Sequence, residues 1–295
     1  MKRLTVSVGV DHIESLARAR KPLLAIIELI WNAFDADAKR VDVILTPNEL
    51  RGLESIQIED DGDGIKPAEF EIGFGQLGDS WKSRAERTKT LGRALHGKRG
   101  VGRYRALSLG GIVTWKTRFV ENSQTMSYEI SFDSGDRRAV IASDTVPTNE
   151  QKGTIVTIEN PSPNLGTLQF DAVKSELTEQ FALYLRQYPD IQLKYDGASV
   201  KPDELTSRTT EEKFTFVTED GQQNPQVLTI IEWKVPLERA LFLCTRDGFS
   251  LRQTAAGIHA PGLQFTAYLQ SELLEKLDAA NSLEIELGDL GKVFV

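Results

Sequence analysis

Three polar side chains recur at helical spacing in a mostly apolar segment. Glu28, Asn32 and Asp35 stand at positions i, i+4 and i+7 within PLLAIIELIWNAFDADA (22–38), so a helix would place all three on one face. The residues around them are apolar, which predicts a buried helix whose polar groups need partners. Two interpretations follow: the three groups are capped or ion-paired inside the core, or they face a ligand cavity.

A second group of residues forms an acidic turn that contains glycine, IEDDGDGI (58–65). Asp60 ends a strand-like run, and Gly62 and Gly64 permit a tight turn with a close backbone approach. A calcium loop would need oxygen ligands at alternate positions and a Glu at its twelfth position. Glu71 meets the last condition, but Gly64 occupies the fifth position, so the sequence disfavours calcium.

A glycine cluster, GKRGVGR (97–103), precedes RYRALSLG, which we expect to be helical. Gly97, Gly100 and Gly102 would expose backbone N–H groups at a helix N-terminus, a geometry that suits an anionic phosphate. The cluster is not a Walker A loop, because no Gly-Lys-Ser/Thr ends it. Later, Gly153 and Thr154 open the strand-like run GTIVTIE, which carries little information by itself.

Basic residues gather around the glycine cluster. The chain has a formal net charge of -8, yet nine Lys or Arg and a single acid, Glu86, lie between Lys82 and Arg105. This local excess indicates either a solvated loop or a site for phosphates, on a nucleotide or on nucleic acid.

Composition excludes several classes of protein. No run of 18 apolar residues is present, so we expect no membrane span and no membrane partner. A single cysteine, Cys244, cannot form an internal disulfide, which fits a reducing cytosol and predicts a cytoplasmic protein. Cys244 lies in the apolar run ALFLCT and is expected to be a buried strand residue. The three histidines show no metal-ligand spacing.

Periodicity and turn signals outline the elements that must position these residues. The first 160 residues predict a helix over 22–38, an irregular segment rich in Gly, Lys and Arg over 66–96, and strands at VDVIL, SIQIE, GIVTWKTRF, TMSYEISF and GTIVTIE. NPSPNLGT (160–167) indicates a boundary between a domain over 1–162 and a second, α+β domain over 163–295. In the second domain we expect helices near 168–187 and 271–280 and strands at DIQLKY, 213–217, 226–235, 240–245 and 263–269. The chain stops on the strand-like run GKVFV, so we expect it to be the front part of a longer polypeptide.

Four of these segments together resemble the gyrase–chaperone–histidine kinase–MutL (GHKL) superfamily of ATPases. ELIWNAFDA (28–36), DDGDG (60–64), GKRGVG (97–102) and GT (153–154) match, in order and spacing, the superfamily's E-x-x-x-N-A-x-D-A helix, D-x-G-x-G turn, G-x-x-G-x-G lid and late G-T. The resemblance covers about residues 1–160 and implies a Bergerat-type α/β sandwich of the α+β class, with a helical layer on a mixed, mostly antiparallel sheet. A fainter resemblance, carried by element order and ALFLCTRDGFSLR, implies a smaller transducer-like α+β domain after it.

The resemblance implies a role for each polar residue of the helix and the acidic turn. Glu28 would be the general base that polarises the attacking water, which requires that no Lys or Arg neutralise it. Asn32 would hold Mg²⁺ through its amide oxygen, and Asp35 would support the nucleotide end of the helix. Asp60 would accept a hydrogen bond from the adenine amino group, where guanine offers a carbonyl instead. Asp61 departs from the family, which usually has Asn at that position.

The remaining nucleotide contacts also follow from the resemblance. Gly62 and Gly64 would let the base approach the backbone, and Thr154 would bond near Asp60 or the adenine. LGDSWKS (77–83) resembles the segment before the lid, so Ser80 and Lys82 are candidate ribose or phosphate contacts; the alternative for Lys82 is a solvated surface lysine. The residues that would surround the phosphates are Gly97, Lys98, Gly100, Val101 and Gly102.

The implied function is Mg²⁺-dependent binding and hydrolysis of ATP that drives conformational cycling. Binding of ATP would bring two copies together as a homodimer, with LTVSV (4–8) as an exchanged strand. Similarity to MORC and MutL proteins, together with the basic segment, favours DNA or a client protein as a partner, in DNA-related or defence processes. The alternatives are a non-catalytic, nucleotide-switched binding module and a chaperone-like client binder. The histidine kinases are disfavoured, because no two-helix dimerisation segment with a phosphoacceptor histidine precedes the pocket.

Overall fold

The computed structural model describes residues 2–5, 21–50, 52–75, 87–96, 105–133, 135, 139–163, 165–169, 171–218, 221–257, 262–280 and 282–283. The chain forms two units, one made of residues 1–177 and 189–200, the other of residues 178–188 and 201–295. Among the described residues, no helix is long and apolar enough to cross a membrane.

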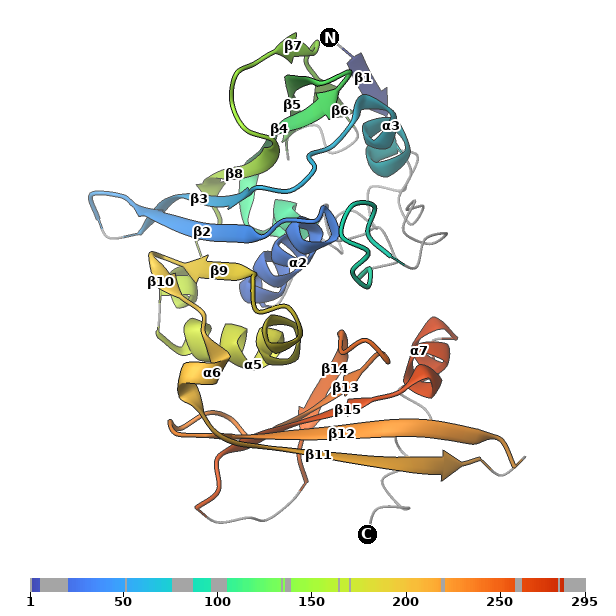
Figure 1. The fold of residues 1–295 in the computed structure, drawn as a ribbon. Coiled ribbons are helices and arrows are strands. Elements are labelled where there is room, and N and C mark those ends of the chain that lie inside the picture. Colours follow the sequence, from blue (N-terminus) through green and yellow to red (C-terminus); the bar gives the residue numbers. More distant parts are fainter. Residues whose placement is uncertain are drawn as a thin grey trace. The chain divides into compact units, whose positions relative to one another are not determined.

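A single large sheet organises the first unit (Figure 1). Its strand order is β1-β6-β5-β4-β8-β3-β2-β9-β10, with β7 paired to β5. All pairs are antiparallel except that of β2 with β9, which is parallel. The strands are β1 (Lys2–Thr5), β2 (Arg40–Pro47), β3 (Leu53–Asp60), β4 (Gly110–Glu121), β5 (Gln124–Asp133), β6 (Ala139–Ala142), β7 (Val146–Pro147), β8 (Gly153–Pro161), β9 (Gln192–Tyr195) and β10 (Ala198–Ser199).

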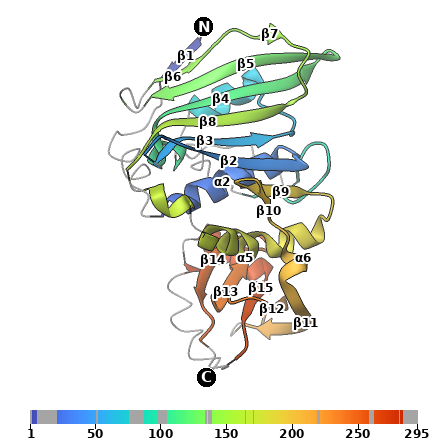
Figure 2. The same ribbon diagram turned by 90° about the vertical axis from the view of Figure 1, so that its left-hand side faces the viewer.

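Helix α2 (Pro22–Asp35) lies against this sheet near β2 and β3 (Figure 2). Pro22 occupies a first-turn position, where its missing N–H costs nothing. Ten of the helix's fourteen residues are buried, because it packs against the sheet and against two short 3₁₀ helices, η2 (Ala106–Ser108) and η4 (Leu165–Gln169). The positions that are not fully buried include Leu24, Glu28 and Asn32, which share one face. Among the described residues, this unit also contains α3 (Pro67–Gly75), next to β1, and the first part of α5 (Asp171–Gln187).

Alternation of apolar and polar residues explains how β2 and β3 face α2. Val41, Val43 and Leu45 are buried on β2, and Ile56 and Ile58 are buried on β3, with more exposed residues between them. A mixed, mostly antiparallel sheet with helices packed against it confirms the predicted α+β class.

Two local expectations fall only partly within the described residues. In the helix predicted at RYRALSLG (103–110), Arg105 is helical, Ala106–Ser108 form η2, and Gly110 already pairs with Pro161 in the β4–β8 ladder. Residues 103 and 104 lie outside the described ranges. The segment predicted as an exchanged strand, LTVSV, begins within β1, whose residues Lys2–Thr5 pair with β6 of the same chain. Residues 6–8 lie outside the described ranges.

The second unit is a five-stranded sheet in the order β11-β12-β15-β13-β14. The strands are β11 (Thr206–Val217), β12 (Gln223–Trp233), β13 (Ala240–Cys244), β14 (Ser250–Ala255) and β15 (Phe265–Gln270), and the short helix α6 (Pro202–Leu205) precedes them. One core cluster joins Ala182 of α5 to strand residues that include Phe242 and Tyr268. A second cluster joins Leu243 to Leu274 of α7 (Glu272–Ala279), so neighbouring residues of β13 serve opposite faces of the sheet.

Cys244 is fully buried in the first of these clusters, as predicted. Burial raises the pKa of its thiol well above the usual value, so the residue behaves as an apolar core residue.

Candidate functional site

A cavity of about 530 Å³ opens in the first unit beside α2. Its volume lies within the range of about 300–1,000 Å³ that is typical of small-molecule sites. The predicted site residues that line it are Asn32, Asp35, Asp60, Gly64 and Thr154. The helix, the acidic turn and the start of β8 therefore border one hollow, although they are far apart in the sequence.

The lining of this cavity combines apolar and charged side chains. The apolar ones include Ile58, Phe74 and Trp115. The charged ones include Asp37, Asp63, Lys66, Glu69, Lys89 and Lys152. An apolar hollow with a few convergent polar groups is the usual form of a site for a small organic ligand.

Asp60 occupies the last position of β3, and its carboxylate is buried. Oδ1 accepts hydrogen bonds from the backbone N–H of Gly62 at 2.8 Å and of Thr154 at 3.3 Å. Burial raises the pKa of this carboxyl to about 7, although the two N–H groups and Arg118 oppose the increase and Asp61 adds to it. Among the described residues both bonds end on Oδ1, so Oδ2 can accept from a ligand. Near neutral pH the group therefore exists both as an acceptor-only carboxylate and as an acid.

The two glycines of the acidic turn are required by the protein's own backbone. A Cβ atom on Gly62 would lie 2.6 Å from the carbonyl oxygen of Ala36, at the end of α2. Gly64 has a φ of +72°, and a Cβ atom there would lie 2.2 Å from the carbonyl oxygen of Arg118. The turn thus packs between α2 and β4 without room for a side chain. Gly64 lines the cavity, whereas Gly62 does not.

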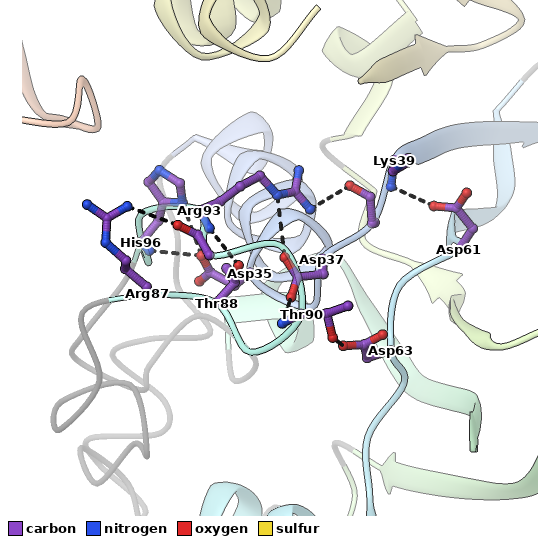
Figure 3. Close-up of polar contacts among 12 residues, drawn as sticks. Asp35, Asp37, Lys39, Asp61, Asp63, Arg87, Thr88, Thr90, Arg93 and His96 are labelled. Carbon is purple, nitrogen blue, oxygen red and sulfur yellow. Dashed lines mark hydrogen bonds and ion pairs between the residues drawn. The ribbon is translucent and has the colours of Figure 1, made fainter. Parts of the chain in front are cut away.

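Asp61 stabilises the start of β2. Its Oδ1 accepts from the backbone N–H of Lys39 at 2.7 Å (Figure 3). Oδ1 also accepts from the backbone N–H of Arg40 at 2.8 Å, and Oδ2 pairs with the Arg40 Nε at 3.1 Å. Partial burial pushes the pKa of Asp61 upward, but these donors outweigh burial and lower it. An acid at this position is therefore charge-compensated, which explains how the chain accommodates a carboxylate directly beside Asp60.

Asp35 is bonded to the chain just before the glycine cluster. Its Oδ1 accepts from the backbone N–H of His96 at 2.8 Å and lies 3.0 Å from His96 Nδ1, and both side chains are buried. The imidazole packs on the ring of Trp31, with ring centroids 4.0 Å apart. Asp35 thus lines the cavity while it fastens residue 96 to α2.

A second anchor follows directly after α2. Asp37, which has a φ of +62°, accepts from the backbone N–H of Thr90 at 2.7 Å and lies 3.5 Å from Nε of the buried Arg93. Arg93 also donates to the carbonyl of Ala38 at 2.9 Å, and the Thr90 hydroxyl donates to Asp63 at 2.5 Å. Residues 87–96 are therefore held to the end of α2 and to the acidic turn by polar contacts (Figure 3).

Glu28 lies one helical turn before Asn32, outside the set of residues that line the cavity. Arg105 Nη1 donates to its Oε1 at 2.7 Å, and the Arg105 and Glu28 side chains are 34% and 29% exposed. To act as the general base predicted from the sequence, Glu28 must not be neutralised by a Lys or Arg. The ion pair with Arg105 does not meet that condition.

The other predicted contacts, Ser80, Lys82, Gly97, Lys98, Gly100, Val101 and Gly102, lie outside the described residues. In those described ranges, no group of three or more His, Cys, Asp or Glu is arranged to hold a metal ion.

Sequence reasoning missed the residues that fasten the site together: Asp37, Arg93, His96 and Arg105. Weak signals existed, since His96 directly precedes the first glycine of the cluster and Arg93 and Arg105 belong to the basic run. None of these signals indicates which residue would be contacted, because each contact joins residues more than 50 positions apart in the sequence.

Parts of the chain are similar in sequence to known proteins. Residues 21–160 match the family model described as "Histidine kinase-, DNA gyrase B-, and HSP90-like ATPase". The DNA mismatch repair protein MutL of Lactiplantibacillus plantarum is 38% identical to this chain over 68 residues, which are 23% of this chain and 10% of that protein. The similarity to that protein therefore covers about a tenth of its length.

A substitution at Gly62 tests the packing of the turn on α2. Gly62→Ala should lower the free energy of unfolding by about 1–3 kcal/mol, because the new methyl group would meet the Ala36 carbonyl oxygen. The matched control is Gly166→Ala, where a Cβ atom would meet nothing within 4 Å and the change should stay within about 1 kcal/mol. Urea denaturation measures both. Equal stabilities for the two variants would show that the turn does not need this close approach.

Proposed function

We propose that the protein binds ATP together with Mg²⁺ and hydrolyses it, because residues 21–160 match the family model of histidine kinase-, DNA gyrase B- and HSP90-like ATPases. One observation carries the proposal: Asn32, Asp60 and Thr154, which come from three separate motifs, line a single cavity of about 530 Å³. The family match supports the class of nucleotide, and the cavity supplies the place for it.

Adenine would bind at the Asp60 end of the cavity. The exocyclic amino group of adenine is a hydrogen-bond donor, and the Asp60 carboxylate, when ionised, can only accept. Guanine presents a carbonyl at the corresponding position, which would face the carboxylate without a hydrogen between them. Thr154, hydrogen-bonded through its backbone to Asp60, would line the same end.

Magnesium would be held beside Asn32. The side chain of Asn32 lines the cavity and offers an amide oxygen, a hard ligand of the kind that Mg²⁺ accepts. Since Mg²⁺ usually takes a few protein oxygens and completes its shell with phosphates and water, a single amide ligand is sufficient. When bound, the ion would offset negative charge on the terminal phosphates.

Glu28 would act as the general base. The side chain lies on the same face of α2 as Asn32, one turn further from the acidic turn, which is the direction in which the phosphates would extend from adenine. Its carboxylate would accept a proton from the water that attacks the γ-phosphorus, while the bond from that phosphorus to the β–γ bridging oxygen breaks and ADP leaves. The ribose and phosphate contacts are still predictions from the sequence; they are Ser80, Lys82, Gly97, Lys98, Gly100, Val101 and Gly102.

Hydrolysis would drive a conformational cycle in which ATP favours a homodimer, and DNA or a client protein would be the partner. The partial similarity to a DNA mismatch repair protein supports testing DNA first.

A second candidate is a nucleotide-switched binding module without turnover. The Arg105–Glu28 ion pair favours this candidate, because a base held by a guanidinium is poorly suited to accept a proton.

Removal of the proposed base separates the two candidates. Glu28→Ala should retain ATP binding and lose phosphate release by about 100-fold or more, because proton transfer by a positioned base contributes on that order. Calorimetry measures the binding, and single-turnover phosphate release measures the rate. Glu121→Ala, which removes an exposed carboxylate at the end of β4, serves as the control. Hydrolysis by Glu28→Ala at the wild-type rate would remove Glu28 from the mechanism.

The pKa of Asp60 predicts how nucleoside binding depends on pH. The carboxylate accepts from adenine only when ionised, and burial raises its pKa to about 7. Affinity for adenosine, whose binding involves no titrating phosphate, should therefore rise about tenfold between about pH 6 and pH 8 and level off above that range.

Calorimetry across this range checks the expectation. Asp60→Asn is the control, since its amide does not titrate; it should bind adenosine weakly and with no slope. A wild-type affinity that stays constant with pH would contradict the assignment of Asp60 to the base.

A further inference from the structure

Arg105 and Glu28 are neighbours only through the tertiary fold. Arg105 directly precedes η2, and η2 packs on α2, which carries Glu28. The guanidinium Nη1 lies 2.7 Å from Glu28 Oε1, the distance of a charge-assisted hydrogen bond. About a third of each side chain remains exposed, so water reaches the pair and it can open without unfolding of its surroundings.

The chemistry of the two partners conflicts with a role for Glu28 as a base. A guanidinium bonded to a carboxylate stabilises the ionised form and weakens it as a proton acceptor. The bond also occupies Oε1, one of the two carboxylate oxygens that could accept a proton from water. A glutamate in this pair is therefore a weaker base than one released from it.

We propose that Arg105 is a positioning residue that restrains Glu28, and that hydrolysis proceeds from the fraction of molecules in which this ion pair is open. The inference rests on the proposed ATPase function and adds a residue that sets its rate. Arg105 acts through Glu28, so its effect requires the carboxylate to be present.

Removal of the guanidinium should make the enzyme faster. Arg105→Gln and Arg105→Met both remove the charge, the first with a polar side chain and the second with an apolar one of similar length. Either should raise the single-turnover rate of phosphate release at saturating ATP and Mg²⁺ by about two- to fivefold, the factor that corresponds to the loss of a partly exposed ion pair. The KM for ATP should change little, because neither partner lines the cavity. Arg105→Lys should return the rate toward that of wild type.

Two controls separate this effect from general damage. Arg186→Gln removes an arginine of similar exposure, 32%, from its ion pair with Asp203 in the second unit, and it should leave the rate unchanged. Glu28→Gln combined with Arg105→Gln should be as inactive as Glu28→Gln alone, because the gain depends on the carboxylate. A purely structural role for Arg105 would lower the rate or leave it unchanged.

The outcomes are distinguishable. Rates at or below wild type for both Arg105→Gln and Arg105→Met would overturn the proposed restraint while leaving Glu28 as the base. A rise in KM accompanied by a fall in kcat would also overturn it, since that pattern assigns Arg105 to the phosphates. No phosphate release above the Glu28→Gln background by wild type would instead defeat the proposed ATPase function, and the inference with it.

Discussion

The carbonyl oxygen of Ala36 accepts a 2.7 Å hydrogen bond from the backbone N–H of Asp63, and this contact joins the end of α2 to the acidic turn after β3. Gly62 fits beneath the same carbonyl only because it has no side chain. The two elements are thereby brought close enough for Asn32 on the helix and Asp60 on the strand to line one cavity. Without this junction, the polar face of α2 would be an ordinary feature of a buried helix.

The acidic residues around this junction divide into two kinds. Asp35, Asp37 and Asp61 accept backbone N–H groups and pair with His96, Arg93 and Arg40, and each joins one part of the chain to another. The pKa of Asp61 is lowered, as expected for a carboxylate with donors. Asp60 differs, because burial dominates its surroundings and raises its pKa. A buried carboxylate that its own protein leaves under-compensated is suited to a ligand that brings a donor.

Local sequence predicted the elements that depend on local rules. The apolar positions of residues 22–38 predicted α2, and alternation in VDVIL and SIQIE predicted β2 and β3. Strand β4 begins at Gly110, the last residue of RYRALSLG, because Gly110 pairs with Pro161 of β8. Alternation did not predict strand β14, because its polar run, SLRQTA, has no apolar alternation. Only the resemblance of ALFLCTRDGFSLR to a strand pair pointed to it, and β13 does pair with β14.

For the site, motif order placed Asn32, Asp60 and Thr154 together, since those residues carry the family resemblance. The contacts of Arg105 with Glu28 and of His96 with Asp35 could not be read from the sequence. Both depend on the path by which the chain returns to α2 after residue 87, and no local pattern encodes that path. Glu28 is expected from the sequence to have no basic neighbour, but Arg105, from a distant segment, is ion-paired with it.

Backbone hydrogen exchange with and without a non-hydrolysable ATP analogue and Mg²⁺ tests the central claim most directly, because it reports on the helix and the turn at once. If one nucleotide site is built at the junction of α2 and the acidic turn, exchange should slow together at residues 60–64 and 153–156 and in the last two turns of α2. Unchanged exchange in all three segments at saturating nucleotide would contradict the claim that this cavity is the nucleotide site.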